Sequence, residues 1–189
     1  MPAASWGGEV MTRAAGFTLI ELMVTVAIMA VLALAGMPFA KSWMESNRQM
    51  QARNLLWEGV AQSRAVALRN PGGTTAGPAA RLERTGAGVL QVTCVDGVAP
   101  DGAAIPCVPD PDANPDRVVW KSVVLPGGDT STLHLASAAN VINPADWTCV
   151  AFDNRGHRVT AGADCATAAG TPRIAIGFND QEPLYVDLL

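Results

Sequence analysis

The first residue in this chain whose type and position point to chemistry is a lone carboxylate, Glu21. From Phe17 to Ala40 it is the only charged side chain in an otherwise apolar run. A charged side chain at the centre of a bilayer costs about 2.5–3.5 kcal/mol, and less towards the interface, so Glu21 needs a positive partner. If the chain is cut between Gly16 and Phe17, the new α-amino group lies one helical turn from Glu21, in the same or a neighbouring subunit.

The apolar run of residues 17–40 is the element that must position this carboxylate. As a helix it is roughly 36 Å long at about 1.5 Å per residue, enough to cross a hydrocarbon core of about 30 Å. Pro38 lies near its end, removes a backbone donor and clashes with the preceding turn, so we expect a helix kink or local melting there. Arg13 precedes the run, and positive charge stays on the cytoplasmic side, so we expect the C-terminal part to face outward.

The hexapeptide Gly16-Phe17-Thr18-Leu19-Ile20-Glu21, followed by an apolar helix, resembles the class III signal of type IV pilins and type II secretion pseudopilins. The resemblance implies cleavage after Gly16 by a prepilin peptidase and N-methylation of Phe17. It also implies that Glu21 guides assembly with other pilins into a helical filament at the inner membrane. Residues 1–16 are then a cleaved leader. A start at Met11 leaves Met-Thr-Arg-Ala-Ala-Gly, which is closer to a usual prepilin leader, so we predict Met11 as the true start.

The chain length of 189 residues favours a single soluble domain that follows one membrane helix. A net charge of −4 argues against a nucleic-acid binder that works by bulk charge.

Four cysteines in an exported domain suggest two disulfides in an oxidising periplasm. Three pairings are possible from sequence, and we favour the local pairs Cys94–Cys107 and Cys149–Cys165. A zinc site is the alternative, but the chain lacks the C-x-x-C spacing of such sites.

A second helical segment is expected over residues 41–70, where Asn70-Pro71-Gly72-Gly73 ends it. At 100° per residue, five apolar side chains of this segment fall within about 40° of one another. This spacing predicts an amphipathic helix that packs one stripe on the downstream strands, the stripe being Trp43, Met50, Trp57, Ala61 and Leu68.

From residue 71 onward the pattern is one of short strands and turns. Strands are expected near residues 80–83, 89–95, 117–125, 131–135, 147–153, 157–160, 173–178 and 184–189, with a turn at 126–129 and a long loop over 96–116. A long helix followed by an antiparallel sheet is the α+β pattern. The segments 52–70 and 150–157 are similar to the FimT/GspH family, which implies a periplasmic GspH/FimT-like β domain over residues 71–189.

Two further sets of residues are candidates for metal binding and catalysis. Oxygen side chains alternate as at the start of a calcium loop, but Pro115 and Lys121 stand where such a loop needs Gly and Glu. We therefore expect no metal, the candidate ligands being Asp110, Asp112, Asn114 and Asp116. His134 and His157 are isolated from any recognisable nucleophile motif, so we expect neither an enzyme nor a cofactor.

The resemblance implies a minor pilin or pseudopilin subunit for type IV pilus biogenesis. One alternative is a type II secretion pseudopilin, and another is a DNA-binding minor pilin of natural transformation. The basic candidates for DNA are Arg155, Arg158 and Arg173. The phrase Arg155-Gly156-His157-Arg158 only approximates the Gly-Arg-x-Arg tail motif of DNA-binding members. Since residues 184–189 hold an acid and no base, DNA is the secondary alternative.

Overall fold

The computed structural model describes residues 16–126, 133–136, 147–160, 165, 173–179 and 181–188. The chain divides into two compact units, Met1–Lys41 and Ser42–Leu189, and each is described by itself. The expected leader up to residue 15, with Met11 and Arg13, lies outside the described residues, and so does most of the expected turn at 126–129.

The helix α1 runs over Leu19–Arg69 and contributes to both units. Within the described residues it is the helix long and apolar enough to cross a membrane. Pro38 lies inside it, and the helix continues through that residue without interruption. The chain therefore does not melt at Pro38, while the kink expected there stays a prediction.

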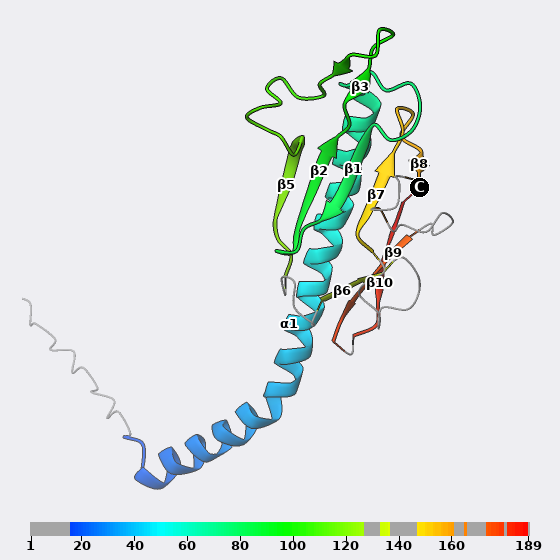
Figure 1. Cartoon of the computed structure of the whole chain (residues 1–189). Coiled ribbons are helices and arrows are strands. Elements are labelled where there is room, and N and C mark those ends of the chain that lie inside the picture. The colour runs from blue at the N-terminus through cyan, green and yellow to red at the C-terminus, as the bar shows by residue number, and fades with distance from the viewer. Residues whose placement is uncertain are drawn as a thin grey trace, which may run out of the picture. The chain divides into compact units, whose positions relative to one another are not determined.

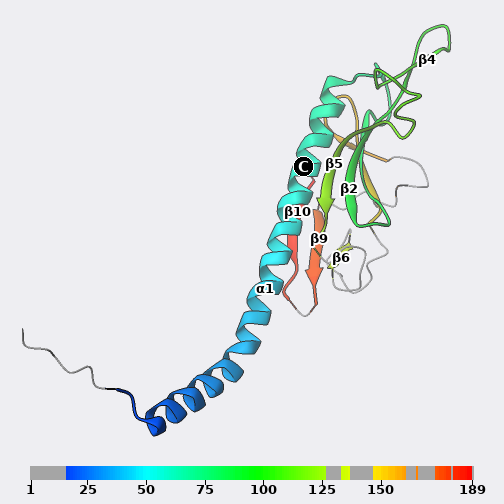
Figure 2. The ribbon, with the colours of Figure 1, turned by 90° about the vertical axis from the view of Figure 1, so that its left-hand side faces the viewer.

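The second unit places the C-terminal half of α1 against two antiparallel sheets (Figures 1 and 2). One sheet has the order β5-β2-β1-β7-β8, and the other has the order β10-β9-β6. The strands are β1 Ala80–Arg84, β2 Val89–Cys94, β5 Val118–Val124, β6 Leu133–Ala136, β7 Cys149–Phe152, β8 Arg158–Val159, β9 Arg173–Phe178 and β10 Leu184–Asp187. The α+β fold expected from the sequence is confirmed.

The strands expected near residues 80–83 and 89–95 pair as the hairpin β1–β2, and those expected near 173–178 and 184–189 pair as the hairpin β9–β10. The expectation of a continuous loop over residues 96–116 is wrong, because β3 Gly97–Val98 and β4 Ala104–Ile105 form a short hairpin inside it. Its turn is closed by the bond from Ala99 N to Ala103 O at 2.8 Å, with Gly102 at a φ of 84°. A positive φ of this kind is easily adopted by glycine, which is why the chain turns there.

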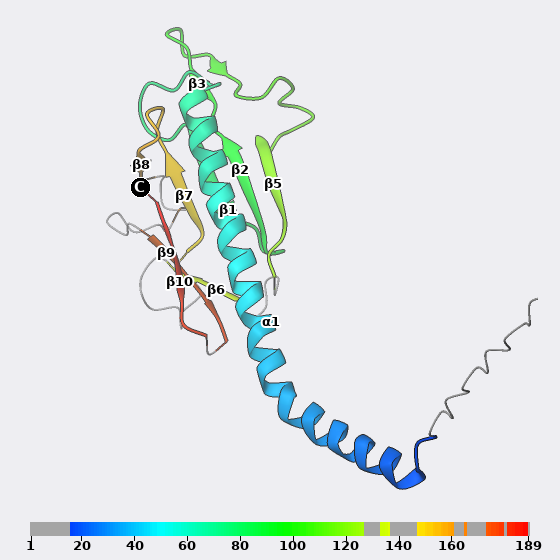
Figure 3. The ribbon, with the colours of Figure 1, turned by 180° about the vertical axis from the view of Figure 1, so that it is seen from behind.

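The face of α1 that packs on the sheets is not the expected stripe. Trp43 is 69% exposed and Trp57 is 58% exposed. In Figure 3 the C-terminal half of α1 lies in front of β1 and β2, with β9 and β10 beside it. The buried residues on the opposite face are mostly small or polar: Gln49, Ala52, Leu56, Gly59, Val60, Ser63 and Ala67.

The physical reason is the close approach of helix and sheet. A Cβ added at Gly59 would lie 2.9 Å from Leu82 Cδ1 and 3.5 Å from the ring of Trp120. At this distance even the Cβ of alanine would require Leu82 to shift, so position 59 holds glycine, and the closely packed interior leaves no room for an indole there. The apolar filling comes instead from the strands, through residues such as Leu82, Phe152 and Ile176.

The end of α1 is fixed by its cap, as the sequence predicted. Asn70 adopts a φ of 47°, in the left-handed region that ends many helices. Its Oδ1 accepts from Thr74 N at 2.9 Å, and its Nδ2 donates to Thr74 O at 2.9 Å. These bonds turn the chain away from the helix axis and towards β1.

Candidate processing and assembly site

The site begins with three non-helical residues, Gly16 to Thr18, that lead into α1. Thr18 Oγ1 accepts a hydrogen bond from Glu21 N at 3.3 Å, and Thr18 O accepts one from Leu22 N at 3.2 Å. Thr18 is therefore the N-cap of the helix. Thr18 and Glu21 also have the spacing of a capping box. The carboxylate thus lies in the first turn, where the helix dipole favours a negative charge.

The Gly16–Phe17 bond lies in open chain just before this turn. Phe17 is 83% exposed, and a Cβ added at Gly16 would meet nothing within 4 Å. A peptidase needs an extended, accessible substrate, and this bond offers one without unwinding the helix. Cleavage there leaves the new α-amino group one residue before the N-cap, within reach of the first turn.

The residues that follow form the apolar surface that accompanies this site. The large apolar side chains from Leu19 to Phe39 are exposed within their unit, so the first half of α1 has no protein core of its own. A helix that is apolar on all sides requires an apolar environment, either lipid or other helices. The first unit thus combines an accessible Gly16–Phe17 bond, a first-turn carboxylate and a helix that needs a partner.

Comparison with family models assigns residues 11–37 to the prokaryotic N-terminal methylation motif. The match indicates a type IV pilin-like protein, and the motif implies processing by a prepilin peptidase and pilin assembly in general. Together with the helix it is consistent with membrane anchoring. Searches of curated proteins and of solved structures found no match.

Both disulfides that the sequence analysis favoured are present in the second unit. Cys94 is bonded to Cys107 with a Cα–Cα distance of 5.9 Å, and Cys149 is bonded to Cys165 with a Cα–Cα distance of 5.1 Å. The first closes the segment that carries the β3–β4 hairpin. The second packs with Ala151 and Val159 in a small cluster over β7 and β8.

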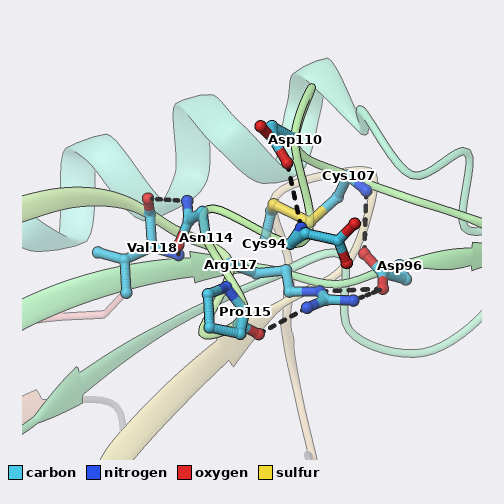
Figure 4. Close-up of polar contacts among 9 residues, drawn as sticks. Cys94, Asp96, Cys107, Asp110, Asn114, Pro115, Arg117 and Val118 are labelled. Atoms are coloured by element: carbon cyan, nitrogen blue, oxygen red, sulfur yellow. Dashed lines mark hydrogen bonds and ion pairs between the residues drawn. A yellow bond between two sulfur atoms is a disulfide. The ribbon is translucent and has the colours of Figure 1, made fainter.

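An ion pair that sequence reasoning missed strengthens the first of these closures (Figure 4). Asp96 Oδ2 accepts from Arg117 Nε at 3.0 Å and Nη2 at 2.9 Å, while Asp96 Oδ1 accepts from Cys107 N at 2.9 Å. The Arg117 guanidinium and the Cys107 N–H together lower the pKa of the Asp96 carboxyl. The sequence signal was faint: Asp96 lies just after Cys94, but Arg117 lies well beyond Cys107.

The residues considered for calcium serve this same loop. Asp110 Oδ1 accepts from Asp112 N at 3.2 Å and Ala113 N at 3.0 Å. The side chain of Asn114 bonds to both the N–H and the carbonyl of Val118, at 3.0 and 2.8 Å (Figure 4). Within the part of the chain that the structure describes, no three His, Cys, Asp or Glu side chains are grouped to hold a metal ion.

The arginines considered for DNA are divided between two sheets. Arg155 lies in the turn between β7 and β8, and Arg158 begins β8. Arg173 begins β9, where its Nε lies 3.8 Å from Asp187 Oδ1 and its guanidinium lies 5.3 Å from the Tyr185 ring centroid. The charge of Arg173 is therefore partly compensated within its own sheet.

The β7–β8 turn is organised by Asp153. Its Oδ1 accepts from the backbone N–H groups of Arg155 at 2.9 Å and His157 at 2.8 Å. Burial alone would raise the pKa of the Asp153 carboxyl, but the two hydrogen bonds and the charge interactions with His157 and Arg155 together outweigh it, so the pKa is lowered. His157 lies 3.9 Å from Asp153 Oδ2 on this turn, whereas His134 lies on β6 opposite Gly177, so the two histidines belong to different sheets.

Proposed function

We propose that this chain is a minor pilin or pseudopilin of the FimT/GspH type, which assembles into a filament after prepilin peptidase cleavage. The observation that supports it most is the position of Glu21. This carboxylate lies in the first turn of an exposed apolar helix, directly after an accessible Gly16–Phe17 bond. The role is assembly rather than catalysis, with the β domain facing the periplasm.

In the proposed mechanism, the peptidase cuts after Gly16 and the α-amino group of Phe17 is methylated. The Glu21 carboxylate of one subunit then pairs with the amino terminus of its neighbour. Within an apolar filament core this pairing removes the cost of an isolated charge, and a charge pair at low dielectric is strong when well aligned. The same pairing sets the axial offset between neighbouring helices.

The substitution Glu21→Val tests this proposal. We expect the variant to enter the membrane as well as the wild type but to be incorporated into filaments much less. Thr25→Val is a matched control, because it removes a hydroxyl one turn further along the helix that donates to Leu22 O at 2.9 Å, within its own helix. Equal incorporation of Glu21→Val and wild type would contradict the mechanism.

Membership of a type IV pilus, rather than of a type II secretion system, is the form of the proposal that we favour. Deletion of the gene distinguishes them when surface pili, twitching, exoprotein secretion and DNA uptake are scored together. Loss of pili and twitching supports the pilus, and loss of secretion alone supports the pseudopilus. Loss of uptake with intact pili would instead direct attention to Arg155, Arg158 and Arg173.

A further inference from the structure

The exposed face of α1 in the second unit carries a seven-residue repeat. Trp43, Met50 and Trp57 are each seven residues apart, and a second row lies four residues after each of them. The two rows together form what we call the heptad seam: Trp43, Asn47, Met50, Asn54, Trp57 and Ala61. Seven-residue spacing of this kind keeps one face of a helix turned towards a partner helix.

Apart from Asn47, which is half-buried, the residues of the seam are exposed and do not belong to the protein's own core. Trp43, Met50 and Trp57 are 69%, 49% and 58% exposed, and Asn54 and Ala61 are also exposed. Beyond Ala61 the next seam position is Arg64, whose guanidinium instead lies 5.4 Å from the Phe152 ring centroid. The available surface therefore covers Trp43 to Ala61.

The polar residues of the seam identify the kind of partner. In heptad terms the tryptophans and Met50 occupy d positions, and Asn47 and Asn54 occupy a positions. Asparagine at a is tolerated in parallel pairs of helices, where the two amides meet across the interface and fix the register. A partner that offers the same amide at the same height is a second copy of this helix.

The charges beside the seam point to the same partner. Arg53 occupies a g position and Glu58 the e position five residues later, so they lie on opposite flanks of one helix. In a parallel, in-register pair, the g residue of one helix meets the following e residue of the other. Arg53 would then face the partner's Glu58, and Glu58 the partner's Arg53. Both side chains are exposed, and neither makes an ion pair or hydrogen bond with any residue that the structure describes.

We propose that two copies of this chain pair through the heptad seam, parallel and in register, while both are anchored in the membrane. A seam of about two and a half heptads is short for an isolated coiled coil. Two chains inserted with the same topology present their helices in the same direction, and confinement in one membrane raises their effective concentration. The inference needs membrane anchoring but does not need filament assembly.

Cysteine cross-linking of the full-length chain in membranes tests the register. The four native cysteines are all in disulfides, so one added cysteine supplies a single free thiol. Ala61→Cys lies on the seam, and Gln62→Cys is an equally exposed control beside it. Both are placed in a Glu21→Val background, where filament contacts are removed if the proposed function holds. In a filament, successive subunits are displaced along the axis, so Ala61 would not meet Ala61 even if assembly persisted.

On oxidation we expect a disulfide-linked dimer with Ala61→Cys and little with Gln62→Cys. Arg53→Glu should lower the dimer yield roughly three- to tenfold, because attraction becomes repulsion on both flanks. The combined change Arg53→Glu with Glu58→Arg should restore it, since the same pairs are re-formed with opposite sign. Equal yields at positions 61 and 62, or failure of the double charge reversal to restore the dimer, would each overturn the proposal.

Discussion

Gln49 in α1 donates from Nε2 to the main-chain carbonyls of Ile176 and Glu182, at 2.8 Å in each case. The side chain is only 3% exposed, so this amide is a buried link between the helix and the β9–β10 hairpin. Buried carbonyls that lose a partner are costly, which explains why a polar residue is placed on the packed face.

We therefore expect Gln49→Leu to lower the free energy of unfolding by about 1–3 kcal/mol, because the buried carbonyl of Ile176 and the partly buried carbonyl of Glu182 lose their donor. Chemical denaturation of the purified protein in detergent measures the change. Gln62→Leu is the matched control, since Gln62 is exposed on the same helix. The structural role assigned to Gln49 is refuted if both variants unfold at the same denaturant concentration.

Leu56 and Trp57 are neighbours on opposite faces of α1, being 0% and 58% exposed. We expect Leu56→Ala to cost about 2–5 kcal/mol, because it leaves a cavity in the core. Trp57→Ala should change the free energy of unfolding by no more than about 0.5 kcal/mol at concentrations where the chain is monomeric. Thermal unfolding in dilute detergent compares the two. If Trp57→Ala destabilised the protein more than Leu56→Ala, the packed face of α1 would be the one with Trp57 that the sequence predicted.

The Asp96–Arg117 pair makes stability depend on pH in a defined direction. Because the pKa of the Asp96 carboxyl is lowered by folding, its contribution is present above the unfolded value of about 3.9. It is lost as the pH falls through the lower folded value, where the carboxylate is protonated. The Tm of Asp96→Asn should therefore lie below that of the wild type at neutral pH.

That difference should shrink at acidic pH, below about pH 4, as the wild type loses the same charge. The measurement is a series of Tm values for both proteins from neutral to strongly acidic buffers. Asp101→Asn serves as control, since Asp101 is exposed at the tip of the β3–β4 hairpin. A constant Tm difference at every pH would mean that the ion pair is not the cause.

The Cys94–Cys107 disulfide should contribute more to stability than the ion pair beside it. In the chain-entropy model a closed loop of about 15 residues is worth about 3 kcal/mol. We expect Cys94→Ser with Cys107→Ser to lose stability on this scale and to become sensitive to proteases between residues 96 and 117. Limited proteolysis followed by mass spectrometry locates the cuts. Wild-type resistance in this segment would show that Asp96 and Arg117 hold the loop without the disulfide.

The sequence by itself determined the local features of this protein. The Gly16-Phe17 bond, the cap at Thr18 and the first-turn position of Glu21 depend on residues within one or two helical turns. The end of α1 at Asn70 and the β1–β2 hairpin are similarly local, because turn chemistry and strand alternation act over a few residues. The residues that cause each of these features are close together in the sequence, so the sequence alone is enough to predict them.

Only the tertiary structure decided which face of α1 is buried. The periodicity of Trp43, Met50 and Trp57 correctly marks an apolar face but does not say what covers it. That choice depends on how closely the helix approaches the sheet at Gly59 and Leu82, which is set by residues far apart in sequence. The pair of Asp96 with Arg117 was likewise decided by the fold, because a contact across 21 residues has no local signal.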